Sequence, residues 1–357
     1  MMKNKEWFKS FISSLIAISC GWIFGLLIMF LVVPSNALEG FSILLRGGIY
    51  RGIKSIGEVL YLSVPIMMTG LSVAFAFKCG LFNIGTPGQY IIGAFVSMFA
   101  AFNLTFIPDS IRWLFATLAG GVAGALWASV PGILKAYRNV NEVISGIMMN
   151  YIGMLIVIEG VKQYMYNSTG AESYSISKSL AVPNLGLDKI FRGSSINIGT
   201  FIAIGVCIIA YVIMNKTTYG YELKAAGYNS NASKYAGMNE KKSIILSMII
   251  AGFFAGLGGA LVYLAGTGRT ISTAEVLAAE GFNGISVALL GFNNPLGVIF
   301  AALFIAYINL GGNYVQAVNI AVEIIDIIVA AIIYFSSFTL FIRLFLEKKR
   351  RYKRGGK

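Results

Sequence analysis

The 357-residue chain contains no histidine, and this absence removes several classes of function at once. Metal sites and proton relays built on imidazole need histidine, and so does nucleophilic catalysis of the Ser-His type. The chain also lacks the GxxxxGK[ST] pattern, so it has no P-loop for ATP. Because no nucleophile, base and metal ligands converge in the sequence, we expect a protein that is not an enzyme and has no cofactor or metal.

The chain also has few charged residues. Charged residues make up 12% of the sequence and hydrophobic residues 57%, whereas about a quarter of a typical soluble domain is charged. The three cysteines, Cys20, Cys79 and Cys207, are widely spaced, which favours small buried side chains over a disulfide framework. The composition therefore favours an integral membrane protein without a large soluble domain.

The sequence contains many long apolar segments. A helix rises about 1.5 Å per residue, so roughly 20 apolar residues cross a hydrocarbon core about 30 Å thick. Backbone groups in lipid must pair within their own segment, which makes each run a helix. We predict an all-α polytopic bundle of about ten crossings, at 11–33, 57–77, 88–107, 113–134, 143–158, 198–214, 243–266, 282–290, 296–310 and 320–341. Eight crossings stay open, because 282–290 is too short to span alone. Within 243–266, Gly252, Gly256 and Ala260 have a spacing that permits close helix packing.

Lysine and arginine predict the orientation of this bundle. With the N-terminus inside, the inner segments (1–10, 78–87, 135–142, 215–242, 291–295 and 342–357) hold 19 of the 28 basic residues and the outer segments hold 9. Positively charged loops stay in the cytoplasm, so both termini are expected there. The expected domains are a cytoplasmic tail (1–10), one transmembrane domain (11–341) and a basic cytoplasmic tail (342–357). The net charge of +13 is assigned to orientation and to contact with membrane lipid, and not to nucleic acid.

Polar residues interrupt the apolar runs at three stretches. Broken backbone at membrane depth survives where it is buried in protein or lines a wet cavity, so each stretch is a candidate for a solute path. A cytoplasmic turn or a favourable helix start explains the same residues without a ligand, and both interpretations stay open. The eight residues selected as candidates for lining or gating a path are Asn83, Gln89, Asn141, Glu142, Ser145, Asn150, Asn283 and Ser286.

Two of these stretches begin alike. Phe82-Asn83 begins the crossing at 88–107 on the inner side of the membrane, and Phe282-Asn283 begins the crossing at 282–290 on the outer side. If the chain consists of two five-helix halves of opposite orientation, these positions are equivalent. Inverted repeats with broken helices near mid-membrane are a known plan of transporters, and we carry such a repeat as a hypothesis.

The longest inner loop, 215–242, contains helix punctuation. Asn229 or Asn231 can cap a short helix through 234–236, and Gly237 can end it. A short helix at the membrane surface offers a contact for another protein. A basic loop resting on lipid headgroups is the simpler alternative.

Four stretches together carry a family resemblance. They are GLFNIGTPGQYIIGAF (Gly80–Phe95), NEVISGIMMNYIG (Asn141–Gly153), YELKAAGYNSNASKYAGM (Tyr221–Met238) and GFNGISVALLGFNNPLG (Gly281–Gly297). In this order they resemble the membrane permease subunits of bacterial ABC importers of the branched-chain amino acid and simple-sugar class, and most of all the nucleoside (guanosine-type) branch. The resemblance covers roughly residues 57–310.

The resemblance implies a permease subunit of an ATP-driven importer in the bacterial plasma membrane, for a nucleoside or a related nucleobase or sugar. It implies three partners: a cytoplasmic ABC ATPase, commonly with two fused nucleotide-binding halves; a second permease, in a heterodimer or a homodimer; and an extracellular substrate-binding lipoprotein. The residues that it assigns to ATPase coupling are Tyr221, Glu222, Ala225, Ala226, Gly227, Tyr235, Ala236 and Gly237. The alternative is a secondary carrier driven by an ion gradient, for which Glu323 and Asp326 are the candidate ionisable pair within a crossing.

Overall fold

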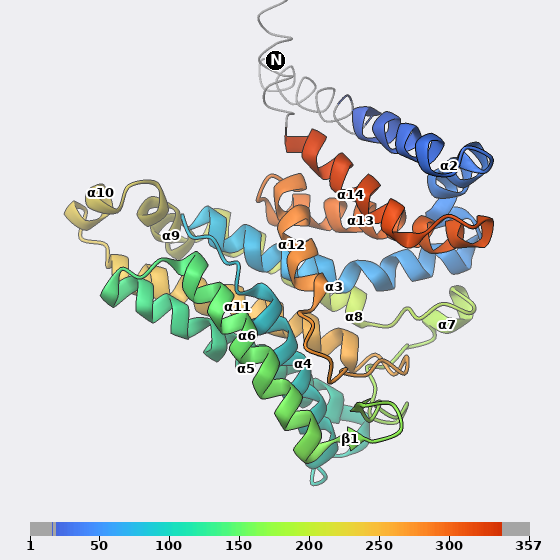
Figure 1. Cartoon of the computed structure of the whole chain (residues 1–357). Coiled ribbons are helices and arrows are strands. Elements are labelled where there is room, and N and C mark those ends of the chain that lie inside the picture. Colours follow the sequence, from blue (N-terminus) through green and yellow to red (C-terminus); the bar gives the residue numbers. More distant parts are fainter. Residues whose placement is uncertain (1–15, 17–18, 338–357) are drawn as a thin grey trace, which may run out of the picture. The chain divides into compact units, whose positions relative to one another are not determined.

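The structure is a computed structural model that describes residue 16 and residues 19–337, and this part of the chain is mostly helical (Figure 1). It divides into two compact units, residues 56–304 and residues 1–55 with 305–357, which are described separately. The larger unit contains all the predicted path and coupling residues.

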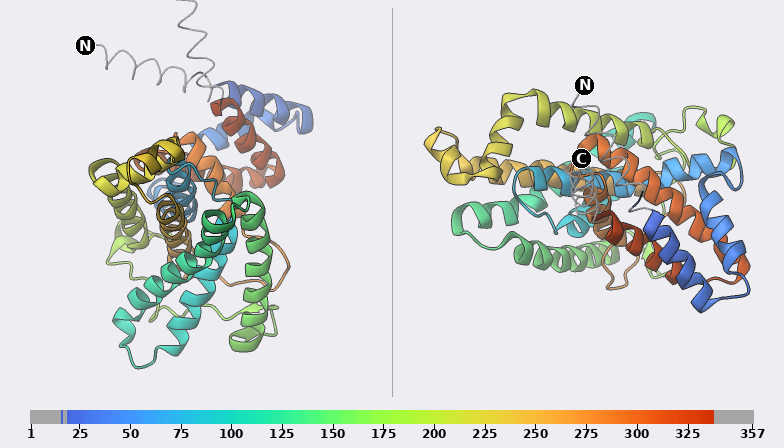
Figure 2. Two further views of the ribbon diagram at one scale, coloured as in Figure 1. Left: turned by 90° about the vertical axis from the view of Figure 1, so that its left-hand side faces the viewer. Right: turned by 90° about the horizontal axis from the view of Figure 1, so that it is seen from above.

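The larger unit consists of helices with one small β-hairpin. Its elements in chain order are α3 (Ile53–Lys78), α4 (Thr86–Asn103), α5 (Asp109–Arg138), α6 (Glu142–Tyr164), β1 (Tyr166–Asn167), β2 (Glu172–Ser173), α7 (Leu187–Ile190), α8 (Gly199–Lys216), α9 (Thr218–Tyr228), α10 (Ser230–Tyr235), α11 (Glu240–Tyr263), α12 (Ala279–Leu290) and α13 (Pro295–Val315). The two strands pair antiparallel, with Tyr166 opposite Ser173. Helices α9 and α10 lie at one end of this unit (Figure 2, right).

The smaller unit joins an N-terminal and a C-terminal part of the chain. Its described elements are a helix (Ser19–Val32), α2 (Ala37–Arg46), a 3-10 turn (Gly47–Ile49), the end of α13, a second 3-10 turn (Gln316–Val318) and α14 (Val322–Ser337). Tyr307 Oη donates a hydrogen bond to the Leu45 carbonyl at 2.6 Å. Asn36 Nδ2 donates to the Val318 carbonyl at 2.9 Å, so side chains connect the two parts directly.

Each of the ten predicted ranges contains a helix over most of its described residues, although α4 ends at Asn103 and α11 at Tyr263, before the predicted ends. Among the described residues, six helices are long and apolar enough to cross a membrane: α3, α5, α6, α8, α11 and α13 with its 3-10 extension. Helix α12 has 12 residues, a rise of about 18 Å, which is less than the core thickness. The structure therefore supports a multi-pass protein, and the number of crossings stays a prediction. Most of 11–18, all of 338–341 and both predicted tails lie outside the described residues.

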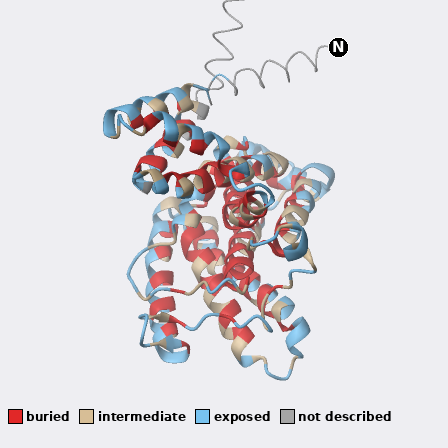
Figure 3. Cartoon of the chain, turned by 90° about the vertical axis from the view of Figure 1, so that its right-hand side faces the viewer, coloured by how far each residue is buried: buried red, intermediate tan, exposed pale blue. Residues whose placement is uncertain are grey.

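Apolar side chains cover the outward faces of several helices in the larger unit. On α5, Leu118, Val122 and Leu126 follow one another at four-residue intervals and are 45%, 50% and 66% exposed. Leu155 of α6 and Ile209 of α8 are also exposed. Buried residues concentrate on the faces where helices turn toward each other (Figure 3). Exposed apolar faces of this kind are unfavourable in water and stable against lipid tails.

Small residues bring α11 against α5 at the centre of the larger unit. An added Cβ at Gly256 would overlap the Gly120 carbonyl, and one at Gly252 would overlap the Gly124 carbonyl. Such close approach maximises van der Waals contact, which is a main attraction between helices in lipid. The spacing of Gly252 and Gly256 in the sequence thus predicts this contact correctly.

We expect the substitution Gly256→Ala to destabilise the protein by about 1–3 kcal/mol, because the new methyl group must push α11 away from α5. The matched control is Gly205→Ala on α8, where an added Cβ meets nothing within 4 Å. Thermal unfolding of both variants in detergent measures the difference. Equal melting temperatures would contradict the close packing described above.

Candidate functional site

The segment 79–85 between α3 and α4 leaves the helix and turns back along it. Gly80 has a φ of +74°, a left-handed conformation that favours glycine. Beyond it, Asn83 Nδ2 donates to Ser72 Oγ at 3.0 Å, so the chain has returned along the last turns of α3. Helix α4 therefore begins beside the interior of α3, with Pro87 in its first turn, where the missing N–H costs nothing.

Two amide side chains form a reciprocal pair at this turn. Asn83 Nδ2 donates to Gln89 Oε1 at 2.8 Å, and Gln89 Nε2 donates to Asn83 Oδ1 at 2.9 Å. Both residues are buried, and Thr86 Oγ1 adds a bond to the Asn83 carbonyl at 2.8 Å. The pair satisfies polar groups that would otherwise be unpaired in a dry interior, where each costs about 1–3 kcal/mol.

Asn150 of α6 attaches a third helix to the same turn. Its Oδ1 accepts the backbone N–H of Gly88 at 2.9 Å, and its Nδ2 donates to the Ile84 carbonyl at 3.0 Å. Gly88 lies in the first turn of α4, whose N–H groups have no partner within the helix. Asn150 thus caps α4 from a different element and is itself buried.

The start of α12 meets the start of α4. An added Cβ at Gly281 would overlap Pro87, so the two helix starts touch backbone to backbone. Thr69 Oγ1, in the middle of α3, donates to the Glu280 carbonyl at 2.8 Å. Two helices thus begin in contact with each other inside the bundle, each after a long helix (α3 or α11) and a returning segment. An inverted repeat would produce this arrangement, and the repeat itself stays a hypothesis.

An ion pair and tyrosines lie beside this junction. Arg269, in the segment between α11 and α12, pairs with Glu280 in the first turn of α12 and lies 5.4 Å from the centre of the Tyr263 ring. The rings of Tyr263 and Tyr90 are 6.2 Å apart in an edge-to-face arrangement. The Tyr90 hydroxyl is buried and has no hydrogen-bond partner among the described residues. The sequence alone does not single out this cluster, because tyrosine within an apolar run resembles core and Arg269 lies in 267–281, one of the segments predicted to face outward.

The other predicted path residues lie away from the amide pair. Asn141 caps α6 by accepting the N–H of Val143 at 2.8 Å, and Glu142 pairs with Lys135 at 3.1 Å. The Ser145 hydroxyl donates to the Asn141 carbonyl at 3.1 Å. On α12, Asn283 is exposed and Ser286 is half-buried. The structure thus brings together Asn83, Gln89 and Asn150, and it leaves the other candidates at helix ends or on an open face.

The predicted coupling segment forms two short helices, α9 and α10. Asn229 caps α10 by accepting the N–H of Ala232 at 3.0 Å, and Gly237, with a φ of +80°, follows the end of this helix. Leu223 is fully buried and anchors α9, whereas Tyr221 and Tyr235 are 65% and 95% exposed. The segment therefore presents exposed aromatic side chains on an anchored support.

The backbone of α9 lies directly against the backbone of Cys79 and Gly80, which follow the end of α3. An added Cβ at Gly227 would overlap the carbonyl carbon of Cys79, and one at Gly80 would lie 2.7 Å from the Gly227 Cα. Burial raises the pKa of Cys79 to about 11, so this thiol stays protonated at neutral pH. Burial, with the nearby Cys79 and Glu222, raises the pKa of Tyr219 in α9 to about 12. The contact is therefore close, neither the Cys79 thiol nor the Tyr219 hydroxyl is ionised there at neutral pH, and the contact leads directly into the segment that carries Asn83.

This arrangement is suited to binding and to movement. Neutral amides and hydroxyls at the junction can exchange hydrogen bonds with one another or with a polar solute. In the described part of the chain, no group of three or more Cys, Asp or Glu could hold a metal ion.

Comparisons with known proteins agree on one family. The sequence model described as "Branched-chain amino acid transport system / permease component" matches residues 55–337. The chain is similar to the nucleoside ABC transporter permease protein NupB of Lactococcus lactis, with 36% identity over 99% of this chain and 97% of that protein. It is also similar to the guanosine ABC transporter permease protein NupP of Bacillus subtilis, with 39% identity over 94% of this chain and 96% of that protein. A second guanosine permease protein of that organism, NupQ, is 29% identical over 70% of this chain and 78% of its own length.

We expect Asn83→Leu to lower stability by about 1–3 kcal/mol, because it leaves the buried Gln89 amide without its partner. The double variant Asn83→Leu with Gln89→Met removes both amides and should recover part of the loss. The control is Asn103→Leu, because the side-chain amide of Asn103 donates a solvent-exposed hydrogen bond to the Phe99 carbonyl. Melting temperatures in detergent measure these changes. Additive losses in the double variant would contradict the pairing.

Proposed function

The chain belongs to the permease components of branched-chain amino acid transport systems, and from this premise we propose that it forms the membrane path of an ABC importer for nucleosides. It is a transport subunit and not an enzyme, as the permease components of these systems are. The observation that carries the substrate class is the near full-length similarity to permeases named for nucleosides and guanosine.

The chemistry of the junction agrees with this cargo. Nucleosides are uncharged and carry many hydrogen-bond donors and acceptors, and amides offer both kinds of group. Asn83, Gln89 and Asn150 supply amides at the meeting point of α4 and α12. We propose that these three gate the path, and that Asn283 and Ser286 line it on α12. Asn141, Glu142 and Ser145 would act at its cytoplasmic mouth.

The partners follow from the family and from the shape of the coupling segment. An ABC permease works with an ATPase and a substrate-binding protein. We propose that the ATPase carries two fused nucleotide-binding halves, and that the binding protein is an extracellular lipoprotein. The matches to both NupP and NupQ of one organism support a second, different permease beside this chain.

We propose that α9 and α10 receive the ATPase. Exposed Tyr221, Glu222, Tyr235 and Ala236 would contact it, and Ala225, Ala226, Gly227 and Gly237 would shape the two short helices. ATP binding would then move α9 and, through the contact of Gly227 with Cys79 and Gly80, the segment that starts α4. Such movement shifts populations between outward-open and inward-open states.

In this proposal the bundle crosses the plasma membrane of a bacterium ten times, with both termini in the cytoplasm. Two of these crossings, 88–107 and 282–290, each follow a returning segment (79–85 and 264–278). The two would be equivalent elements of an inverted repeat.

Uptake tests the function directly. Radiolabelled guanosine should enter cells that carry the chain with its ATPase, second permease and lipoprotein, and uptake should stop when the P-loop lysine of the ATPase is replaced. Excess nucleosides should compete with the label better than sugars do. Uptake that survives loss of the lysine would instead show a carrier driven by an ion gradient.

The variant Gly227→Val tests coupling. The added side chain must push α9 away from Cys79, so we expect ATP-driven uptake to fall at least tenfold while the protein still inserts in the membrane. Gly205→Val, in open space on α8, is the control. Normal uptake by Gly227→Val at equal protein levels would contradict the coupling role of α9.

A further inference from the structure

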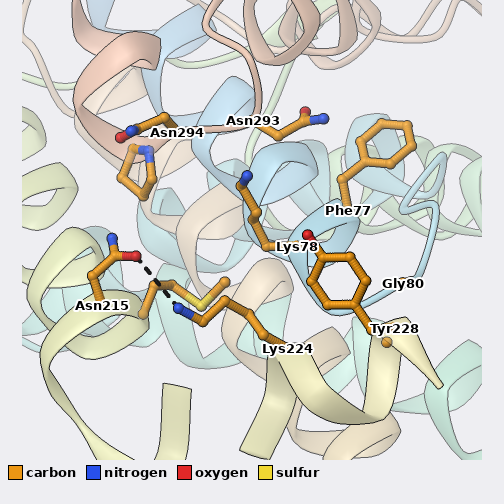
Figure 4. A pocket seen from close by; sticks show the side chains of 11 residues that line it. Phe77, Lys78, Gly80, Asn215, Lys224, Tyr228, Asn293 and Asn294 are labelled. Carbon is orange, nitrogen blue, oxygen red and sulfur yellow. Dashed lines mark hydrogen bonds between the residues drawn. The ribbon is translucent and has the colours of Figure 1, made fainter. Parts of the chain in front are cut away.

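A pocket opens where three segments of the larger unit converge, and its volume is about 360 Å³ (Figure 4). The segments are the end of α3, the α8–α9 corner and the turn between α12 and α13. Each belongs to a segment (78–87, 215–242 or 291–295) that the count of basic residues assigns to the inner side. The pocket therefore faces the cytoplasm in the predicted orientation.

The charge of the pocket is positive and unpaired. Lys78 and Lys224 line it, and no aspartate or glutamate does. Lys224 Nζ donates to Asn215 Oδ1 at 3.4 Å, and the described residues offer neither lysine an ion pair. Two ammonium groups without a carboxylate favour an anion, and phosphate is the anion that lysine commonly binds.

The remaining lining fits an aromatic base. Tyr228 is 89% exposed, so its ring is free to stack on a ligand. Phe77, on the wall of the pocket, is held by stacking on Phe82 at 4.9 Å. Asn293 also lines the pocket, and its Oδ1 is buried and finds no hydrogen-bond partner in the described part of the chain. Stacking rings and an unsatisfied acceptor are the groups that a base with N–H donors would use.

The backbone beside Asn293 is held in an unusual conformation. Phe292 and Asn293 have φ angles of +54° and +52°, a left-handed conformation that asparagine tolerates and that costs energy in phenylalanine. The turn is fixed by close contact between Gly291 and Gly297, where side chains would collide. Strain of this kind persists at ligand sites more often than in plain turns.

We propose that the pocket binds a nucleoside monophosphate from the cytoplasm. Lys78 and Lys224 would hold the phosphate, Tyr228 would stack on the base, and Asn293 would accept a hydrogen bond from it. The volume lies near the lower end of the range for small-molecule sites, about 300–1,000 Å³, and exceeds the needs of a lone phosphate.

The consequence concerns regulation and rests on the proposed function. Lys78 belongs to α3 and Lys224 to α9, so one phosphate would connect the two helices next to the contact of Gly80 with Gly227. A bound nucleotide would hold α9 against α3 and oppose the coupling movement. The phosphorylated form of the imported cargo would thereby slow further import.

Binding is measured on the whole importer in nanodiscs of zwitterionic lipid, without ATP or lipoprotein. We expect calorimetry to detect binding of GMP, and guanosine and inorganic phosphate to bind at least tenfold more weakly. The Lys78→Gln variant should lower the affinity for GMP about tenfold. Lys216→Gln removes a charge at the same end of the unit, outside the pocket, and should leave GMP binding unchanged. Equal GMP affinity in the wild type and Lys78→Gln would overturn the proposal.

Two further experiments distinguish GMP from other possible occupants of the pocket. If nanodiscs with phosphatidylglycerol abolish GMP binding and the wild type enriches this lipid relative to Lys78→Gln, the pocket is a lipid site and the proposal fails. If Lys78→Gln instead loses the ATPase on purification and binds GMP normally, the pocket receives an acidic side chain of the ATPase, and the proposal also fails.

Transport gives the regulatory readout. In proteoliposomes, GMP on the ATPase side should lower the initial rate of guanosine uptake at least threefold in the wild type and leave Lys78→Gln unaffected. If uptake occurs and GMP has no effect on it, regulation is refuted and the proposed function stands. If no guanosine uptake occurs without GMP, the proposed function fails, and calorimetry still decides on the pocket.

Discussion

The requirement that buried backbone groups be paired controls the architecture of this protein. In lipid, an interrupted helix exposes N–H and C=O groups that water cannot reach. At the start of α4, side chains from other parts of the chain offset this cost. Asn150 caps the helix by accepting the N–H of Gly88, and Asn83 pairs with Gln89 beside it. Thr69 adds a hydrogen bond to the carbonyl of Glu280 in the first turn of α12. The junction is therefore both the mechanical centre of the larger unit and the place where polar chemistry is available at depth.

Most of the fold could be predicted from the sequence, because hydrophobic run length depends only on local composition. Each predicted range contains a helix over most of its described residues, and the spacing of Gly252 and Gly256 correctly indicated a close contact. The number of complete crossings could not be derived. Helix α4 begins with polar residues and α12 is short, and only tertiary contacts show that both start inside the bundle. Pairing partners far apart in the chain, such as Gly281 and Pro87, leave no local signal.

The candidate site was predictable in part. Polarity within an apolar run singled out Asn83, Gln89 and Asn150, which the structure brings together. It could not separate them from Asn141, whose side chain caps a helix. The Arg269–Glu280 pair and the pocket beside the end of α3 could not be predicted for a different reason. Their members are ordinary residues in separate loops, and they acquire chemical meaning only from the folded chain.

The contact between Gly227 and the turn at Cys79 and Gly80 has a mechanical consequence. Side chains between two helices act as springs, because rotamers can change while the helices shift. Here main chain abuts main chain, and no such compliance exists. A displacement of α9 would therefore pass to the turn before α4 without being absorbed by side chains, and a side chain at Gly227 or Gly80 would force the two segments apart.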